Sequence, residues 1–510
     1  MEEQKFWLAI DTGGTAIKVG LYDQAGKECC VKGITIEPSK PNPGWMERCL
    51  ETMWQQCLEL MKEIVAESEL PSSSVKAITM TGYGNGLALI DAEGNPVRPG
   101  ILSSDTRAAK IVDTWRKKGF DDTHQTLTHQ PMWAGKPLPL VAWLKDNEPE
   151  NLSKAKYIVM VKDYVRAQLT GVIEQEISDA SSASLVETES RQYAIRMFES
   201  LGMYELTDKL PPLIDTLSVA GKLREDVAKY IGLASGTPVT AGYADGPAMM
   251  VGQGVSGEQS VGVIAGTWGL NQMYSSKSVT DGSILATLLS YEEGKYVLVD
   301  GSANSGSVMQ WVVDAIIKRC LSIEKGGKSV VTDSDIYQWI EHAVKEVKSE
   351  PSDLFFLPHL NGRIDASGMF ANFLGTKSWH DVRHMILAVM EGVAFEHRYH
   401  VENLCTKNKK PKIVRFGGGV SRSNEWVKVF ANVLATPIEL CEVEETGALG
   451  CAILAAVCLG EHTTVEKAIK AMSGVRDCVE PEKEQACYLN RKYKKYLTLR
   501  SKMKNGTNEN

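Results

Sequence analysis

The sequence predicts an α/β fold built as two domains, and three observations lead to that prediction. The chain has 510 residues, which is too many for one hydrophobic core and suits two domains of roughly 230 to 250 residues each. Apolar runs of strand length alternate with stretches of helical periodicity in both halves. Each half also contains a hairpin of two apolar runs joined by a Gly/Thr turn, at Trp7–Tyr22 and at Val261–Gln272. Two such hairpins favour a protein that holds one anionic ligand from two sides.

The first half is expected to alternate strands and helices. Trp54, Leu58, Met61 and Ile64 recur at helical spacing and predict one amphipathic helix. The expected elements are, in order, strands 6–10 and 17–22, that helix over 46–68, strands 75–80 and 87–91, a segment 101–107 that ends a strand and opens a helix, a largely helical stretch 130–235, and a strand 237–241.

The second half repeats this pattern after a hinge expected at 252–257. Its expected elements are strands 259–265, 270–274 and 296–300, a helix 305–320, a strand 354–357, a helix 379–404, a strand 413–416, a helix 421–434, a strand 438–441 and a helix 447–459. The predicted domains are therefore 1–252 and 253–490, followed by a tail 491–510 that is basic and helical and then polar and disordered after Lys504.

Composition excludes several classes of protein. The net charge of −8 gives no support for nucleic-acid binding. The most apolar stretch, 447–460, is too short to span a bilayer, and 6–10 opens a strand instead of a signal peptide. The eleven cysteines include no CxxC pair, and the nine histidines do not pair with cysteines at zinc-ligand spacing. We therefore expect a cytoplasmic protein with reduced thiols and no membrane or nucleic-acid partner.

The first hairpin has the composition of a phosphate-binding turn. Glycine tolerates the backbone angles that let several N–H groups converge on an anion, and the threonine hydroxyls add donors. Asp11, at the mouth of the turn, offers the oxygen ligand that Mg²⁺ prefers, directly or through its water shell. The alternative is that both hairpins are ordinary and Asp11 is a surface residue.

Asp245 follows a predicted buried strand and opens a predicted helix, in Ala241-Gly-Tyr-Ala-Asp245-Gly-Pro247. Aspartate is a good helix N-cap, and a proline two residues later fits that role. The alternative is a general base that takes the proton of a substrate hydroxyl. Both roles are compatible, because one carboxylate oxygen can cap while the other binds substrate.

Two glycine-rich segments differ in how strongly they indicate a ligand-binding site. In Phe416-Gly-Gly-Gly419 three glycines would let a flat ligand such as adenine approach the backbone, although a plain loop is the alternative. The segment 252–257 matches GxGxxG, but a helix-like run precedes it and a strand follows it, the reverse of a dinucleotide fingerprint. This segment is the only feature that would support the hypothesis that the protein is a dehydrogenase.

Taken together, the motifs resemble the FGGY family of carbohydrate kinases, over residues 5–500. They are Asp11-Thr-Gly-Gly-Thr15, Ser104-Asp105-Thr-Arg107, Gly242-Tyr-Ala-Asp245, Gly266-Thr267, Phe416-Gly-Gly-Gly-Val-Ser-Arg-Ser-Asn424 and Glu445-Thr-Gly-Ala-Leu-Gly450. No single motif is specific, but their order is. The resemblance implies two ribonuclease H-like (actin-type ATPase) domains with an interdomain cleft that holds ATP and Mg²⁺.

The resemblance also implies roles for single residues. Asp245 matches the catalytic base, and Asp11 would lie near the magnesium. The residues expected to contact the nucleotide are Gly13, Gly14, Thr15, Lys18, Gly266, Thr267 and Gln310, with Gly418, Gly419, Ser423 and Asn424 around the adenine. The sugar would contact Asp245 and the pocket residues Tyr83, Gly84, Asn85 and Asp105.

Departures from the family pattern narrow the range of expected substrates. Tyr83-Gly-Asn85-Gly86 stands where kinases of D-xylulose usually show Gln-Met-His-Gly, Ser103 where a tryptophan is common, and Leu140 where a lysine is usual. These changes count against D-xylulose and glycerol. Leu102-Ser-Ser-Asp105, Gly266-Thr-Trp268 and Val443-Glu-Glu-Thr446-Gly447 are similar to the L-xylulose kinase branch.

We therefore expect a homodimeric enzyme that transfers phosphate from ATP to a primary hydroxyl of a small sugar, a ketopentose such as L-xylulose. The alternatives within the family are erythritol, erythrulose, D-xylulose, L-ribulose and glycerol. The alternative of another class is a non-catalytic actin-like regulator that binds sugar and nucleotide. It would need no base at Asp245 and should carry a DNA-binding segment, yet no basic helix-turn-helix precedes Lys5.

Overall fold

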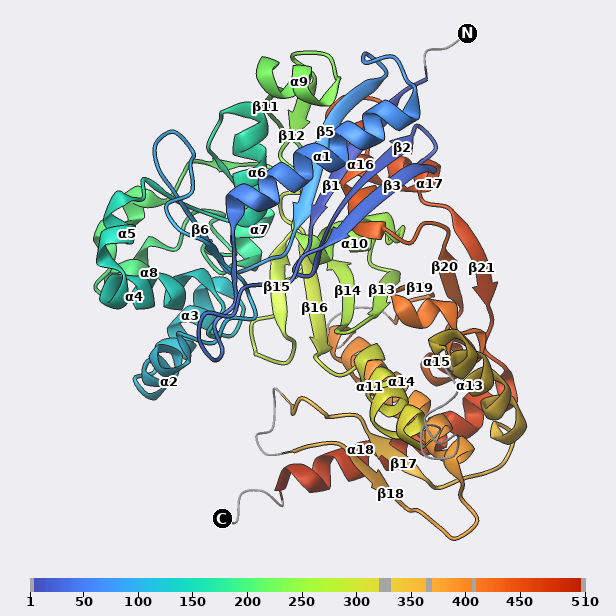
Figure 1. The fold of residues 1–510 in the computed structure, drawn as a ribbon. Helices are drawn as coiled ribbons and strands as arrows, with labels where there is room; N and C mark the ends of the chain where they lie inside the picture. The colour runs from blue at the N-terminus through green and yellow to red at the C-terminus, as the bar shows by residue number, and fades with distance from the viewer. Residues whose placement is uncertain (1–3, 321–331, 364–368, 406–409, 506–510) are drawn as a thin grey trace. The chain divides into compact units, whose positions relative to one another are not determined.

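The computed structural model describes residues 4–320, 332–363, 369–405 and 410–505. Its internal contacts divide the chain into two compact units. Unit 1 comprises Met1–Gly257, Tyr274–Leu298 and Glu445–Gly474, and unit 2 comprises Glu258–Met273, Val299–Glu444 and Val475–Asn510. Each unit is therefore assembled from segments that are distant in the sequence (Figure 1).

Unit 1 is organised around a mixed six-stranded sheet. Its strand order is β11-β12-β5-β1-β2-β3, with β1 (Phe6–Thr12) antiparallel to β2 (Ala16–Asp23) and parallel to β5 (Val75–Gly82). The other members are β3 (Glu28–Thr35), β11 (Val219–Lys222) and β12 (Pro238–Thr240). β1 and β5 are buried along almost their whole length, as expected of strands covered on both faces.

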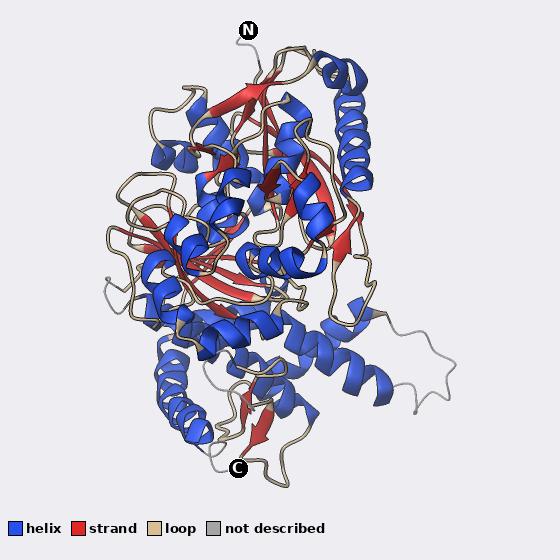
Figure 2. Ribbon diagram, turned by 90° about the vertical axis from the view of Figure 1, so that its left-hand side faces the viewer, coloured by secondary structure: helices blue, strands red, loops and turns tan. Residues whose placement is uncertain are grey.

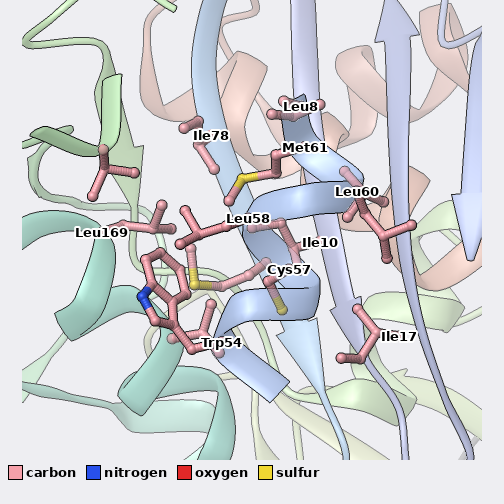
Figure 3. Close-up of a cluster of buried hydrophobic side chains, with 14 of the residues drawn as sticks. Leu8, Ile10, Ile17, Trp54, Cys57, Leu58, Leu60, Met61, Ile78 and Leu169 are labelled. Carbon is pink, nitrogen blue, oxygen red and sulfur yellow. The ribbon is translucent and has the colours of Figure 1, made fainter. Parts of the chain in front are cut away.

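Helix α1 (Leu50–Ser68) covers one face of this sheet. Side chains alternate between the faces of a strand, so Leu8 and Ile10 of β1 point to the same side. They join Trp54, Leu58 and Met61 of the helix in one hydrophobic cluster (Figure 3). The predicted helical spacing of these α1 residues is therefore confirmed. The helix begins at Leu50 and not at 46, because Glu47–Arg48 form the short strand β4.

Helix α16 (Thr446–Cys458) covers the opposite face and crosses α10 (Asp245–Gly252) at very short range. A Cβ atom built on Gly450 would lie 1.9 Å from the carbonyl oxygen of Ala248, and one on Gly252 would lie 1.8 Å from that of Thr446. Only glycine allows the two backbones this approach. On the same face, a Cβ on Gly447 would lie 3.7 Å from Asp11 Oδ2, so the beginning of α16 lies beside Asp11.

The rest of unit 1 is a series of short helices and strand pairs. The pairs are β4 (Glu47–Arg48) with β7 (Gly100–Ile101), β6 (Ala88–Ile90) with β8 (Tyr157–Val159), and β9 (Gln175–Glu176) with β10 (Leu213–Ile214). The helices are α2 (Ala109–Lys117), α3 (Phe120–Thr128), α4 (Pro137–Asn147), α5 (Pro149–Lys154), α6 (Val161–Thr170), α7 (Ile177–Ser182), α8 (Ile195–Ser200), η1 (Tyr204–Lys209), α9 (Glu225–Ile231) and α17 (Val465–Met472), with a further strand β15 (Ala286–Leu289). The largely helical stretch predicted over 130–235 thus includes four short strands.

A second mixed sheet has seven strands in the order β15-β16-β14-β13-β19-β20-β21, of which all but β15 lie mainly in unit 2. The strands other than β15 are β13 (Ser260–Ala265), β14 (Gly269–Ser275), β16 (Tyr296–Ser302), β19 (Ile413–Gly417), β20 (Ile438–Cys441) and β21 (Val475–Val479). As in unit 1, an antiparallel hairpin, β13–β14, continues into a parallel pair, β13–β19. The hairpin predicted for each half is therefore confirmed in both.

Helices of unit 2 lie beside this sheet (Figure 2). They are α11 (Gly306–Val312) continued by η2 (Val313–Ile317), α13 (Asp333–Val347), α14 (Val382–Leu404), η3 (Gly419–Arg422), α15 (Asn424–Leu434) and α18 (Lys483–Asn505). A small hairpin pairs β17 (Phe355–Leu357) with β18 (Asn372–Leu374). Helix α14 contacts α13, α15 and β17 and forms the centre of the helical layer. The disorder predicted after Lys504 lies largely outside the described residues.

Within the described parts of the chain, no helix combines the length and the apolar run needed to cross a bilayer.

We predict that Gly450→Ala destabilises unit 1. The added methyl group meets the backbone of Ala248, and overpacking of this kind costs about 1–3 kcal/mol. Urea unfolding should show a lower midpoint. The matched control is Gly419→Ala in unit 2, where an added Cβ meets no atom within 4 Å; equal midpoints for the two variants would contradict the prediction.

Candidate functional site

The turn of the first hairpin is held by Arg48. The Arg48 guanidinium donates hydrogen bonds to the carbonyl oxygens of Gly13 (2.8 Å) and Gly14 (2.6 Å). A Cβ built on Gly14 would meet nothing within 4 Å, so the turn presents open backbone. Thr15 is exposed at the same turn. The turn predicted to bind phosphate is thus rigidly held and accessible.

Asp11 and Lys18 lie opposite each other in the β1–β2 register. Lys18 Nζ donates to Glu445 Oε1 at 2.6 Å, at the beginning of α16. Burial raises the pKa of Asp11 to about 7, with further contributions from Asp245 and Glu445 and an opposing one from Lys18. Asp11 and Glu445 therefore lie near one lysine, and Asp245 is close enough to disfavour the ionised form of Asp11. Carboxylates gathered in this way favour a bound cation.

Asp245 is the first residue of α10 and follows β12 by a short turn. Ala244 occupies the N-cap position, so the predicted capping role of Asp245 is wrong. Asp245 is partly exposed, and burial of the group raises its pKa to about 6. A carboxyl group at the end of a strand whose pKa lies close to neutral pH has the properties of a general base.

The loop that follows β5 lies against α7. Tyr83 is buried and its ring faces the Arg48 guanidinium at 5.8 Å. Asn85 adopts φ = 63°, a left-handed conformation that asparagine tolerates better than most residues. A Cβ built on Gly84 would lie 3.3 Å from Ser182 Oγ and 3.9 Å from Asp179 Oδ1. The predicted pocket loop is therefore packed directly on α7.

Asp105 is 1% exposed, and its carboxylate is heavily engaged. It accepts hydrogen bonds from the backbone N–H groups of Met46 (2.6 Å) and Arg107 (2.8 Å) and from the Arg107 guanidinium. Arg107 in turn pairs with Glu47 and lies 4.1 Å from the ring centroid of Trp45. These contacts give Asp105 a structural role in ordering its loop; its contact with a sugar stays a prediction.

A cluster of buried charged side chains lies around the beginning of α7, and it was not predicted from the sequence. Lys162 Nζ lies 2.9 Å from Asp163, 3.6 Å from Glu176 and 3.9 Å from Asp179. All four side chains are fully buried. Glu176 also accepts hydrogen bonds from the backbone N–H groups of Ser178 and Asp179. The spacing of these residues resembles no metal or nucleophile motif, so only the folded structure reveals the cluster.

Unit 2 contains a cavity of about 960 Å³ between the β13–β14 turn, α11, α13 and the glycine-rich loop. Six of the predicted nucleotide residues fall in it or beside it: Gly266, Thr267, Gln310, Gly419 and Ser423 line it, and Gly418 supports its floor. Gly418 has φ = 89°, and a Cβ there would lie 2.7 Å from the Ala265 backbone. Asn424 is exposed and is not among the lining residues.

The side chains of the cavity are ordered by hydrogen bonds. Gln310 donates to Asp314 at 2.9 Å and accepts from the Tyr337 hydroxyl at 2.9 Å. Ser423 donates to Glu341 and accepts from the backbone N–H of Trp426. The polar ends of α11, α13 and α15 are thereby fixed before any ligand binds.

Helix α13 supplies the cavity residues that sequence reasoning missed: Ser334, Tyr337, Gln338, Ile340 and Glu341. Two signals could have found it. Thr332 and Asp335 form a reciprocal capping box, and Ile336, Ile340, Ala343, Val344 and Val347 recur at helical spacing.

Magnesium fits the residues present around Asp11. Within the described segments, no group of three or more His, Cys, Asp or Glu side chains could hold a metal by itself. Mg²⁺ does not need such a cage, because it commonly binds one or two carboxylates together with water and substrate phosphates. Burial raises the pKa of Asp11, with smaller contributions from Asp245 and Glu445, and a divalent cation beside it would favour the ionised form.

The chain matches the models of both domains of one protein family. The N-terminal domain of the FGGY family of carbohydrate kinases matches residues 6–252, and its C-terminal domain matches residues 261–459. The chain belongs to the FGGY family of carbohydrate kinases. It is therefore a carbohydrate kinase, and the resemblance inferred from the motifs is confirmed.

Individual FGGY kinases match along nearly the whole chain. The L-xylulose/3-keto-L-gulonate kinase of Escherichia coli is 29% identical over 97% of this chain and 96% of its own length. A probable L-xylulose kinase of Haemophilus influenzae is 28% identical over 98% and 99%. The crystal structure of a ligand-bound xylulose kinase from Lactobacillus acidophilus superposes with a TM-score of 0.87 over 98% of both chains at 20% identity. The predicted two-domain, actin-type fold is confirmed.

We predict that Asp11→Asn stabilises the protein at pH 8. The folded pKa of Asp11, about 7, exceeds the ordinary aspartate value of 3.8, so ionisation between these values weakens folding as the pH rises. The variant should gain about 4 kcal/mol at pH 8, at about 1.4 kcal/mol per pKa unit, and less than about 1 kcal/mol at pH 4, close to the pKa of the unfolded state, where little of the carboxyl group is ionised in either state.

Thermal unfolding at both pH values checks this, with the exposed Asp113→Asn as control. A lower melting temperature for Asp11→Asn at pH 8 would show that the Asp11 charge is compensated.

Proposed function

We propose that this FGGY kinase transfers the γ-phosphate of ATP to a primary hydroxyl of a ketopentose such as L-xylulose. The observation that carries the proposal is Asp245, a partly exposed carboxyl group with a pKa near 6 at the beginning of α10. In its ionised form it would accept the proton of the attacking hydroxyl. The names of the E. coli and H. influenzae relatives support the choice of sugar.

The nucleotide is assigned to the unit 2 cavity. Its glycine-rich floor leaves room for a flat base, and Thr267 and the Gly266 backbone lie at one wall, where they would contact phosphate oxygens. The hairpin turn of unit 1, with Gly13, Gly14, Thr15 and Lys18, would also offer donors to phosphate oxygens. Charge that develops on the transferred group is met by these donors.

Magnesium is assigned to Asp11, directly or through water. When bound, it would neutralise the nucleotide phosphates and polarise the transferred group. Lys18, paired with Glu445, would hold the opposite side of the site.

A cytosolic location and a homodimer complete the proposal. All eleven cysteines are free thiols, which suits a reducing compartment. The oligomeric state is directly measurable by light scattering.

The test of the proposed function is an ADP-release screen with L-xylulose, D-xylulose, L-ribulose, erythritol, erythrulose and glycerol. The highest kcat/KM is expected for L-xylulose. Sugar-independent ADP release alone, with no stimulation by any member of the panel, would contradict a kinase for these sugars.

We predict that Asp245→Asn lowers kcat by about 100-fold or more, the scale of a lost general base. The asparagine keeps the shape of the side chain, so ATP binding measured by calorimetry should be unchanged. Near-normal kcat would exclude Asp245 as the base.

We further predict that kcat/KM for the sugar falls about tenfold for each pH unit below pH 6. Above pH 6 kcat/KM should stay constant. The active form of a base is the deprotonated one, and the pKa of Asp245 is about 6. A rate profile from pH 4.5 to 8.5 checks this. An activity that stays constant down to pH 5 would mean that another group takes the proton.

A further inference from the structure

Two backbone N–H groups at the tip of the first hairpin have no hydrogen-bond partner among the described residues. They belong to Gly14 and Thr15, which lie between β1 and β2. Thr15 is exposed, and a Cβ built on Gly14 would meet nothing within 4 Å, so the tip is accessible to a ligand. Neighbouring N–H groups bind one anion together only when they point to the same side of the backbone.

Arg48 determines the side to which these two N–H groups point. Its Nη1 donates to the carbonyl oxygen of Gly13 at 2.8 Å, and its Nη2 donates to that of Gly14 at 2.6 Å. The C=O and N–H groups of a planar trans peptide point in opposite directions, and none of the described peptide bonds is cis. Because the carbonyl groups of Gly13 and Gly14 point toward Arg48, the N–H groups of Gly14 and Thr15 point away from it.

The guanidinium group has the shape that this task needs. Its donors form a rigid planar fork, so a fork that bridges two successive carbonyl groups fixes two peptide planes relative to each other. The backbone that carries the fork is held independently of the turn. Arg48 lies opposite Gly100 in the β4–β7 pair, and the carboxylate of the preceding residue, Glu47, accepts from Arg107 at 2.7 Å.

The charge of Arg48 is also exceptional among the buried arginines of unit 1. Arg48 is 3% exposed, and no carboxylate of the described residues forms an ion pair with it. Its Nε is buried without a hydrogen-bond partner in the same part of the chain. Buried charges are normally paired, so a cation behind an open turn favours an anion in front of that turn. The other three buried arginines of unit 1 each have a carboxylate partner: Arg98 pairs with Glu47, Arg107 with Asp105 and Arg166 with Asp163.

We infer that Arg48 is a positioning residue for phosphate binding, which holds the N–H groups of Gly14 and Thr15 in the orientation that lets both donate to phosphate oxygens of ATP. This inference rests on the proposed function, because it takes ATP as the phosphate donor. The alternative is that Arg48 only stabilises the fold by binding two carbonyl groups. Measurements of ATP affinity and of stability on the same variants separate the two roles.

The first test compares Arg48→Lys with the wild-type full chain. Lysine keeps the positive charge but has no planar fork, so it cannot fix both peptide planes. The Kd for ATP with Mg²⁺, measured by calorimetry, should rise about 10-fold or more, the scale of a lost hydrogen bond to a charged group. The Kd for adenosine, which carries no phosphate, should stay unchanged. These measurements need no sugar, so they decide the inference even if no sugar of the panel is phosphorylated, a result that would contradict the proposed function itself.

The matched control is Arg166→Lys. Arg166 is fully buried in unit 1, and its guanidinium also bridges two carbonyl oxygens, those of Ala241 (2.9 Å) and Glu174 (2.6 Å). Both variants should lower the melting temperature, but only Arg48→Lys should weaken ATP binding. The positioning role is refuted if Arg48→Lys leaves the Kd for ATP unchanged, if it weakens adenosine binding equally, or if Arg166→Lys weakens ATP binding to the same extent.

The second test needs no variant. Hydrogen exchange of residues 11–18 is measured on the wild-type protein by mass spectrometry without ligand, with adenosine, and with ATP and Mg²⁺. ATP should slow the exchange of the two N–H groups at the tip of the turn, whereas adenosine should not. Exchange that is equally fast with ATP would overturn the inference, even if Arg48→Lys did not fold.

Discussion

The backbone contact between α10 and α16 is the constraint on which the candidate site of unit 1 depends. Gly252 and Gly450 let the two helices cross with no side chain between them. The N-terminus of α16 then lies beside Asp11, and α10 carries Asp245 at its own first residue. Two acids distant in the sequence thereby influence each other, and the pKa of Asp11 rises in part because of Asp245. Charge repulsion of this kind persists in a fold only where packing enforces it.

The hydrogen bonding of polar side chains differs between the cavity of unit 2 and the pocket loop of unit 1. In the unit 2 cavity the side chains are tied to one another, as in the chain from Tyr337 through Gln310 to Asp314. Near the pocket loop of unit 1, the Asp179 carboxylate and Asn85 Oδ1 are buried without a hydrogen-bond partner among the described residues. A cavity whose side chains already hydrogen-bond to one another suits a ligand recognised mainly by shape and by backbone contacts.

Local patterns predicted the parts of the structure that local chemistry determines. Both hairpins, the strand–turn–helix at Asp245 and the glycine-rich loop at 417–419 were recognised because glycine, threonine and alternating apolar residues constrain the backbone over a few positions. Helix α13 was missed although its capping box and periodicity are present. Asp179 and its unpartnered oxygens could not be predicted, because hydrogen-bond satisfaction depends on groups brought together from distant parts of the chain.

The grouping of Glu445–Gly474 with unit 1 has a consequence for biosynthesis. The sheet face that carries Asp11 is covered by α16, which a ribosome produces only after more than four hundred residues. Until then the nascent polypeptide holds an uncovered β1–β2–β5 surface. Cotranslational folding of the first unit must therefore end late, and the emerging chain is a natural client for chaperones that shield apolar sheets.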